Sequence, residues 1–126
     1  MSEPTERYKL GMVTRRAVLG DAHVDAASAA ITDFDADFQT LITETAWGSL
    51  WSRPEISKRE RSMITVALLA ALGHSDEVAM HIRATRNTGA SLADIREALL
   101  HVAVYAGVPA ANHGFHIASE ELSKPQ

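Results

Sequence analysis

Apolar residues recur along most of this 126-residue chain at spacings of three and four, which is the period of an amphipathic α-helix. The dipeptides that typically close β-hairpins are missing between these stretches. We therefore expect an all-α protein with a single domain over residues 1–126. Helices are predicted near residues 3–19, 33–48, 57–72, 75–87, 91–107 and 108–122, with a short segment at 24–30.

Residues with known capping preferences mark the expected helix ends. Gly20, Gly73 and Gly89 follow helical patterns and are typical C-terminal stops. Ser57 and Glu60 form an S-x-x-E capping box at the start of another helix. The remaining start signals are Asp33 or Asp35, Ser75 or Asp76, Ser91, and Pro109 in a first-turn position.

Three apolar patterns predict which helix sides are buried. Residues 63–72 are apolar on all sides, which is typical of a helix in a core or at a subunit interface. A small chain with such a helix is expected to be an oligomer. The other predicted buried stripes are Phe34, Phe38, Leu41, Ile42 and Thr45 in one helix, and Leu92, Ile95, Leu99, Val102 and Ala106 in another.

A histidine interrupts one of the apolar stripes. Val78, His81, Ile82 and Thr85 fall at i, i+3, i+4 and i+7, so they share one helix face. Such a histidine is either a hydrogen-bonded core residue or the centre of an acid–base site. Spacing alone favours the core residue, although Glu77, one turn earlier, is placed to pair with it.

Charged residues around the capping box allow two interpretations each. Glu60 is either a helix cap or a carboxyl group with a raised pKa that donates a proton, and spacing favours the cap. Arginines near a helix N-terminus are poorly placed for the helix dipole, so Arg53, Arg59 and Arg61 are either anion ligands or a solvated basic turn. Spacing alone favours the turn. Trp51, beside Arg53, is expected in the core, or else lining a pocket.

Composition narrows the class of protein. A net charge of −4 and a hydrophobic content of 46% suit a soluble cytoplasmic protein and argue against nucleic-acid binding. We expect no signal peptide, and the longest apolar run, 63–73, is too short to span a bilayer.

There is no cysteine, hence no disulfide and no thiolate chemistry. His113-x-x-His116 lacks an accompanying E-x-x-H or H-E-x-x-H pattern, so no metal is expected.

Several stretches together resemble the gamma-carboxymuconolactone decarboxylase family. They are "RRAVLGDAHVD", "AWGSLWSRP", "SKRERSMITVALLAALGH", "DEVAMHIRATRNTGAS" and "REALLHVAVYAGVPAANHGFHIA", and the resemblance covers about residues 8–122. The wider superfamily includes alkylhydroperoxidase-D-like proteins, which carry a C-x-x-C pair followed by a histidine. Here His81 matches that histidine, Glu60 matches an upstream glutamate, and His74 lies near the place of the first cysteine. Without cysteines, the peroxidase chemistry of those relatives is excluded.

The resemblance implies a fold and a reaction. The fold would be all-α, alkylhydroperoxidase-D-like, built around an antiparallel helical hairpin and assembled as a homohexamer, a trimer of dimers. The reaction would convert 4-carboxymuconolactone, a lactone dicarboxylate, to 3-oxoadipate enol-lactone and carbon dioxide in protocatechuate breakdown. The lactone carbonyl accepts the electron pair of the leaving carboxylate, so no cofactor is expected.

The same resemblance suggests roles for individual residues. His81 would donate the proton or polarise the carbonyl, and Glu60 would be its partner or an alternative donor. The expected substrate-binding residues are Arg61, Arg53, His74 and Trp51. Two other readings stay open: a non-catalytic helical oligomer that binds an aromatic acid or a protein partner, and a thiol-free relative of the peroxidases.

Overall fold

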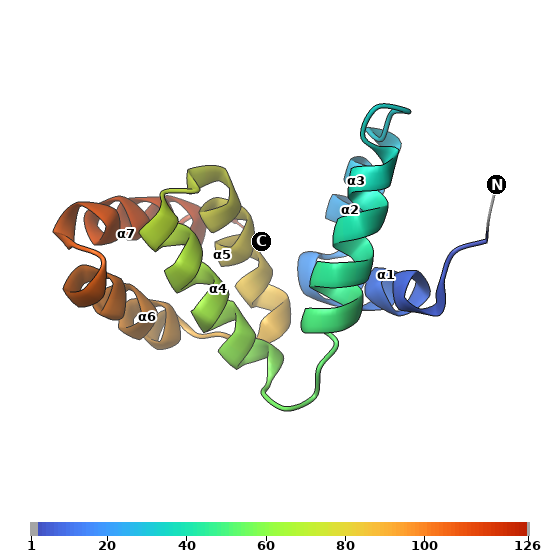
Figure 1. Ribbon diagram of the computed structural model, residues 1–126. Helices are drawn as coiled ribbons and strands as arrows, with labels where there is room; N and C mark the ends of the chain where they lie inside the picture. The colour runs from blue at the N-terminus through green and yellow to red at the C-terminus, as the bar shows by residue number, and fades with distance from the viewer. Residues whose placement is uncertain (1–2, 126) are drawn as a thin grey trace. The chain divides into compact units, whose positions relative to one another are not determined.

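The computed structural model describes residues 3–125, and within this range every regular element is a helix (Figure 1). This confirms the all-α prediction. Two compact units divide the chain, Met1–Ile56 and Ser57–Gln126, and each is described by itself. The expectation of one domain over the whole chain stays a prediction. The helices are α1 (Glu6–Leu19), α2 (Asp21–Ala29), α3 (Ala36–Ile42), the π-helix η1 (Thr43–Leu50), α4 (Lys58–Leu72), α5 (Ser75–Thr88), α6 (Leu92–Tyr105) and α7 (Val108–Leu122).

Local capping chemistry explains most of the helix bounds. Ser57 and Glu60 form the predicted capping box at α4, and Ser91 forms a second one with Asp94 at α6. Gly73 and Gly89 end α4 and α5 with φ values of 78° and 85°, where a side chain would be strained.

Two of the predicted helix starts are wrong. The first helix begins at Glu6, because the Thr5 hydroxyl caps it by accepting a hydrogen bond from the Tyr8 N–H. The predicted cap at Ser75 or Asp76 is replaced by His74, because Ser75 is already helical and its side chain is hydrogen-bonded to His113.

In the N-terminal unit, α1 packs against η1 through two glycines. A methyl group added at Gly11 would overlap the carbonyl oxygen of Thr43, and one added at Gly48 would overlap the carbonyl oxygen of Arg7. The two helix backbones therefore touch directly, and this contact places the buried side of α1 against the first turn of η1.

The close contact between α1 and η1 explains why the stripe predicted to be buried in residues 33–48 is wrong. Phe34 is 99% exposed, and Phe38, Leu41 and Thr45 are exposed as well, while Ile42 is partly buried. The buried residues are instead Thr43, Trp47 and Gly48. Two physical reasons apply: the helix turns its smallest residue toward α1, and the i→i+5 bonds of a π-helix break the 3.6-residue period on which the prediction relied.

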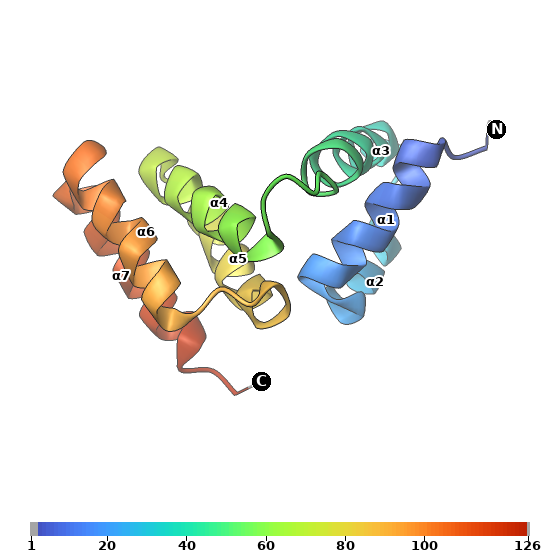
Figure 2. The same ribbon diagram turned by 90° about the horizontal axis from the view of Figure 1, so that it is seen from below.

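In the C-terminal unit, four helices surround one apolar core. Helices α4 and α5 form an antiparallel hairpin, and α6 and α7 form a second one (Figure 2). The predicted α5 stripe of Val78, His81, Ile82 and Thr85 is buried as expected. Leu92 and Ala106 were expected in the α6 stripe but are exposed, because they lie at the two ends of the helix, outside the core. The core residues are Val66, Ala70, Val78, Ile82, Ile95, Leu99, Val102, Ala111 and Ala118.

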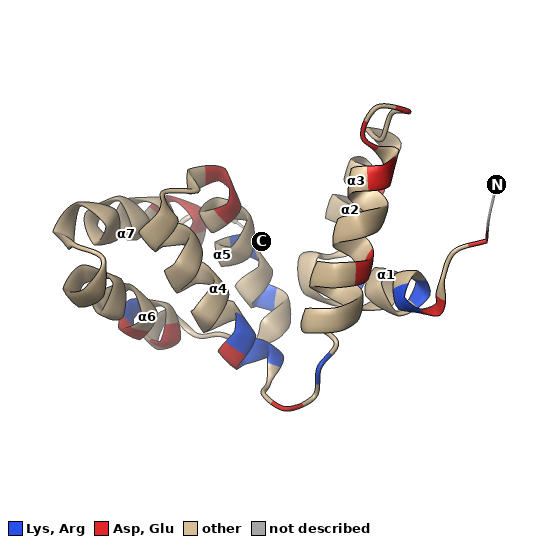
Figure 3. Ribbon diagram, in the orientation of Figure 1, with Lys and Arg blue, Asp and Glu red and all other residues tan. Residues whose placement is uncertain are grey.

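Helix α4 is apolar on both its inner and its outer side. Its charged residues are confined to the first turn, and no charge follows along the rest of the helix (Figure 3). Val66 and Ala70 are in the core, whereas Ile64, Leu68 and Leu72 are more than half exposed. The prediction that this helix contributes to a core is confirmed for its inner side. The prediction that its outer side forms a subunit interface stays a prediction.

Over the part of the chain that the structure describes, no helix is both long enough and apolar enough to cross a membrane.

A charged pair at the base of α4 predicts one pH effect. Arg59 donates two hydrogen bonds to Asp94, of 2.7 Å to Oδ2 and 2.6 Å to Oδ1, which joins α4 to α6. This pair and the Ser91 backbone N–H hold the pKa of Asp94 well below its usual range. A lowered pKa in the folded state means that the stabilisation is present above about pH 4 and is lost as the pH falls further.

We therefore expect Asp94→Asn to lower the melting temperature at pH 7 but to differ progressively less from the wild type below pH 4. Thermal melts from pH 7 to pH 2 measure this. Asp33→Asn is the control, because Asp33 is exposed and makes no ion pair within residues 3–125. An equal deficit for Asp94→Asn at pH 7 and pH 2 would contradict the expectation.

Candidate functional site

Two buried ionisable side chains define the candidate site in the C-terminal unit. His81, in the middle of α5, is 6% exposed, and Arg61, in the first turn of α4, is 8% exposed. Within residues 58–88, all of which the structure describes, the other ionisable side chains of the hairpin are partly or fully exposed. One imidazole and one guanidinium of the hairpin are therefore buried.

A buried hydrogen bond shows how the two helices of the hairpin are aligned. The hydroxyl groups of Ser62 and Thr88 are 2.7 Å apart, so the start of α4 lies beside the end of α5. His81 precedes Thr88 by two helical turns, which is about 10 Å along the axis. His81 and Arg61 thus lie on the same hairpin at levels that differ by about this length.

Glu60 is the helix cap that its spacing suggests. Its Oε1 accepts hydrogen bonds of 2.9 Å from both the backbone N–H and the hydroxyl of Ser57, and the side chain is exposed. These bonds lower the pKa of Glu60 from its usual value, with the backbone N–H of Ser57 as the larger cause. The structure therefore supports a charged carboxylate at this position and gives no support to a raised pKa.

His74 lies at the other end of the hairpin. It is the exposed N-cap residue of α5, directly after the turn at Gly73. Glu60 precedes it by fourteen residues, almost all of them in α4, which corresponds to about 20 Å. One copy of the chain therefore does not bring His74 and Glu60 together at one small molecule.

The remaining two predicted site residues belong to the N-terminal unit. Trp51 is 4% exposed, and its ring centre lies 5.4 Å from that of Trp47, so it is part of that unit's core. Arg53 is exposed, and its Nη2 lies 3.6 Å from Oε1 of Glu55. In this structure, Trp51 thus behaves as the core residue that was the first expectation.

One charged residue in the N-terminal unit was not singled out by the sequence. Arg15 is 8% exposed and lies where α1 meets the junction of α3 and η1. Its Nη1 donates weakly to Oγ1 of Thr43 at 3.4 Å and to Oε1 of Gln39 at 3.5 Å. The signal was available, because Gly11, Arg15 and Val18 fall at i, i+4 and i+7 and so share the buried face of α1.

The histidine pair on α7 has separate local partners. His113 Nε2 lies 2.8 Å from the Ser75 hydroxyl, and His116 Nε2 lies 3.3 Å from a carboxylate oxygen of Glu120. Among residues 3–125, no three histidine, aspartate or glutamate side chains are clustered closely enough to hold a metal ion.

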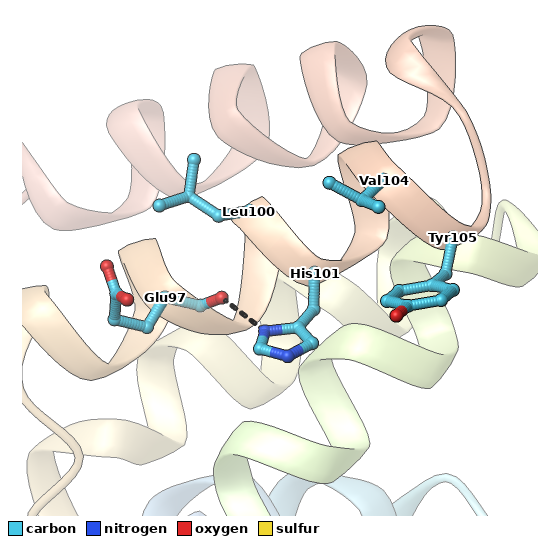
Figure 4. A pocket seen from close by; sticks show the side chains of 5 residues that line it. All are labelled: Glu97, Leu100, His101, Val104 and Tyr105. Atoms are coloured by element: carbon cyan, nitrogen blue, oxygen red, sulfur yellow. Dashed lines mark hydrogen bonds between the residues drawn. The ribbon is translucent and has the colours of Figure 1, made fainter.

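The surface hollows of α6 are apolar and lie away from His81 and Arg61. One, of about 200 Å³, is lined by Glu97, Leu100, His101, Val104 and Tyr105 (Figure 4). Another, of about 340 Å³, lies between α4 and α6 and is lined mainly by Met63, Ile64, Ala67, Leu68 and His101. Broad apolar hollows of this kind are typical of protein–protein contacts.

The all-α fold agrees with the comparison to known proteins. A model of the carboxymuconolactone decarboxylase family matches residues 36–120, which include Arg53, Glu60, Arg61, His74 and His81. The chain belongs to this family.

Three curated relatives are also decarboxylases by name. A 4-carboxymuconolactone decarboxylase of Acinetobacter baylyi is 44% identical over 115 residues, which is 91% of this chain and 86% of that protein. Another, from Pseudomonas putida, is 54% identical over 43 residues, 34% of this chain and 90% of that protein. A nitrosuccinic acid decarboxylase of Metarhizium robertsii is 40% identical over 99 residues, 79% of this chain and 69% of that protein.

Proposed function

We propose that this protein decarboxylates 4-carboxymuconolactone to 3-oxoadipate enol-lactone and carbon dioxide. The observation that carries the proposal is the 44% identity over 91% of the chain to a protein of that name. The buried imidazole and guanidinium of the α4–α5 hairpin support it, because a decarboxylase that acts on an anion needs a proton donor and a cation.

The reaction requires little beyond these groups. As the ring C–COO⁻ bond breaks, carbon dioxide leaves and the electron pair moves through the ring double bond to the lactone carbonyl oxygen. A proton then adds to the carbon next to that carbonyl, so the enzyme consumes one proton for each carbon dioxide released. A donor near the carbonyl oxygen stabilises the charge that builds there.

We assign the roles as follows. His81 donates the proton or polarises the carbonyl, and Arg61 holds a carboxylate of the substrate. Glu60 is kept as a partner for the imidazolium rather than as a proton donor, and because it lies about 10 Å along the hairpin from the level of His81, it would pair with the imidazole of a second copy of the chain. Arg53, His74 and Trp51 are kept as substrate-binding proposals. Because of the distance between His74 and Glu60, these two would serve one reaction only across two copies of the chain.

A second substrate is supported by a specific observation, the 40% identity over 79% of the chain to a nitrosuccinic acid decarboxylase. The chemistry is parallel: the nitro group would accept the electron pair, as the lactone carbonyl does. Both substrates are dicarboxylic acids that lose one carboxylate and keep the other.

The test is to incubate the purified protein with each acid, without added cofactor and after dialysis against a chelator. Carbon dioxide release with loss of the lactone absorbance supports the proposal. Turnover of nitrosuccinate alone supports the second substrate. Binding of either acid without turnover would support a non-catalytic binding protein, and loss of activity on dialysis would contradict a cofactor-independent reaction.

We also propose that the protein is a cytoplasmic homo-oligomer, specifically a homohexamer. The support is the apolar outer face of α4 and α6, where exposed apolar side chains line the two hollows described above. Light scattering during gel filtration measures the assembly mass, and a monomer at micromolar concentration would contradict the proposal. The side chains of this face that are at least 46% exposed are Ile64, Leu68, Leu72, Leu100, Val104 and Tyr105.

A further inference from the structure

Several partly exposed arginines of this protein pair with carboxylates, whereas the buried Arg15 does not. Arg16, Arg59 and Arg83 each pair with a carboxylate at 2.6–3.1 Å, and their side chains are 36–51% exposed. Arg15 is 8% exposed, yet within residues 3–125 no carboxylate lies at ion-pair distance from it. Burial normally demands pairing, because an uncompensated charge in the interior is costly.

Its neutral neighbours do not replace a counter-ion. The two contacts of Nη1 with Thr43 and Gln39 are at the upper limit of hydrogen bonding. The Thr43 hydroxyl already donates to the carbonyl oxygen of Gln39 at 2.7 Å. The buried Nε of Arg15 has no hydrogen-bond partner within the described chain. These neutral neighbours therefore leave the charge of the buried guanidinium uncompensated.

The position of this guanidinium is held by the backbone. Arg15 lies one turn after Gly11, where α1 touches η1 at Thr43. Because two helix backbones are in contact at that point, the start of the Arg15 side chain cannot move away from η1 without separating the helices. A cation held in place in this way is suited to recognise a specific anion.

We propose that Arg15 is a carboxylate-binding residue for the substrate, and that it recognises the carboxylate that remains after decarboxylation. This rests on the proposed function, because both candidate substrates are dicarboxylic acids that keep one carboxylate. The planar guanidinium matches a carboxylate in a two-point contact through its two terminal nitrogens. The observations that carry this proposal all concern residues of the N-terminal unit, Met1–Ile56.

Thermal stability tests this independently of turnover. An unpaired buried cation destabilises the free protein, so Arg15→Met is expected to melt about 3 °C or more above the wild type without ligand. Adipate, an unreactive six-carbon dicarboxylate, is expected to raise the melting temperature of the wild type but not of Arg15→Met. The matched control is Arg16→Met, which removes the neighbouring charge and should keep the adipate effect.

Kinetics supply the second test. Arg15→Met is expected to raise KM on the order of 10- to 100-fold with a smaller change in kcat, and Arg15→Lys to give an intermediate KM. A KM within twofold of the wild type would overturn the proposal. So would an Arg15→Met protein that melts lower and still responds to adipate, since that pattern belongs to a structural arginine.

Failure of the proposed function gives a different result. In that case the wild type releases no carbon dioxide from either acid, while the adipate shift still reports on Arg15. If Arg15→Met does not fold, Arg15→Lys decides by the same two readouts. A loss of assembly mass in Arg15→Met, with the adipate shift retained, would show that a carboxylate of a second copy faces Arg15 and would overturn the proposal.

Discussion

Replacing His81 with alanine is expected to lower kcat for carbon dioxide release about 100-fold or more, while the chain stays folded. The physical reason is that the imidazole is the proposed donor toward the carbonyl oxygen or the carbon that is protonated. A donor that acts mainly in the transition state is worth about 3 kcal/mol, by analogy with oxyanion holes. The loss should therefore appear in kcat and leave KM nearly unchanged.

Burial makes a conservative variant necessary, because alanine leaves a space beside Val78, Ile82 and Thr85. His81→Gln keeps a hydrogen-bonding side chain of similar size but cannot transfer a proton at neutral pH. If His81 is the proton donor, His81→Gln should be as inactive as His81→Ala, whereas a role as carbonyl polariser should leave it partly active; in both cases its melting temperature should be closer to the wild type. Asp76→Asn, at an exposed position of the same helix, is the control for general effects on α5. Wild-type turnover by both His81→Ala and His81→Gln would return His81 to the status of a core residue.

The second large effect is expected at Gly11. Gly11→Ala should destabilise the N-terminal unit by about 3 kcal/mol or more, because the added methyl group overlaps a backbone carbonyl oxygen rather than a mobile side chain. Relief requires α1 to move away from η1, which exposes Thr43. Circular dichroism melts and limited proteolysis of the region before residue 56 measure the loss.

The control for this substitution lies on the same helix. Val13→Ala changes a side chain that is 68% exposed and should alter stability by no more than about 0.5 kcal/mol. Gly48→Ala approaches the same helix contact from the other side and should resemble Gly11→Ala. A Gly11→Ala protein that melts with the wild type would show that the two backbones are not in contact in solution.

The candidate site was only partly readable from the sequence. His81 could be placed on a buried helix face because its neighbours at three- and four-residue spacing are apolar, and the structure buries it there. The sequence could not show whether Arg59 is a ligand-binding residue, because the carboxylate that pairs with it, Asp94, lies 35 residues away. Arg15 was missed although it occupies a buried-face position, because a charge beside a second arginine looks like a solvated surface.

The sequence by itself determined those features that arise from interactions within one or two helical turns. The capping boxes at Ser57 and Ser91 and the glycine stops at Gly73 and Gly89 depend on hydrogen bonds and backbone angles between near neighbours. These interactions are strong enough locally to survive in any all-helical arrangement of the chain, and so the helix ends were largely predictable.

Only the tertiary structure decided which side of a helix turns inward and which charges find partners. Phe34 and Phe38 form a plausible apolar stripe, yet the contact between Gly11 and η1 turns Thr43 and Trp47 inward instead. The physical reason is that burial depends on how closely two helices approach, and this depends on small residues that are far apart along the chain. The period of the hydrophobic residues predicts that a helix has a buried face, whereas the packing of the helices decides which face that is.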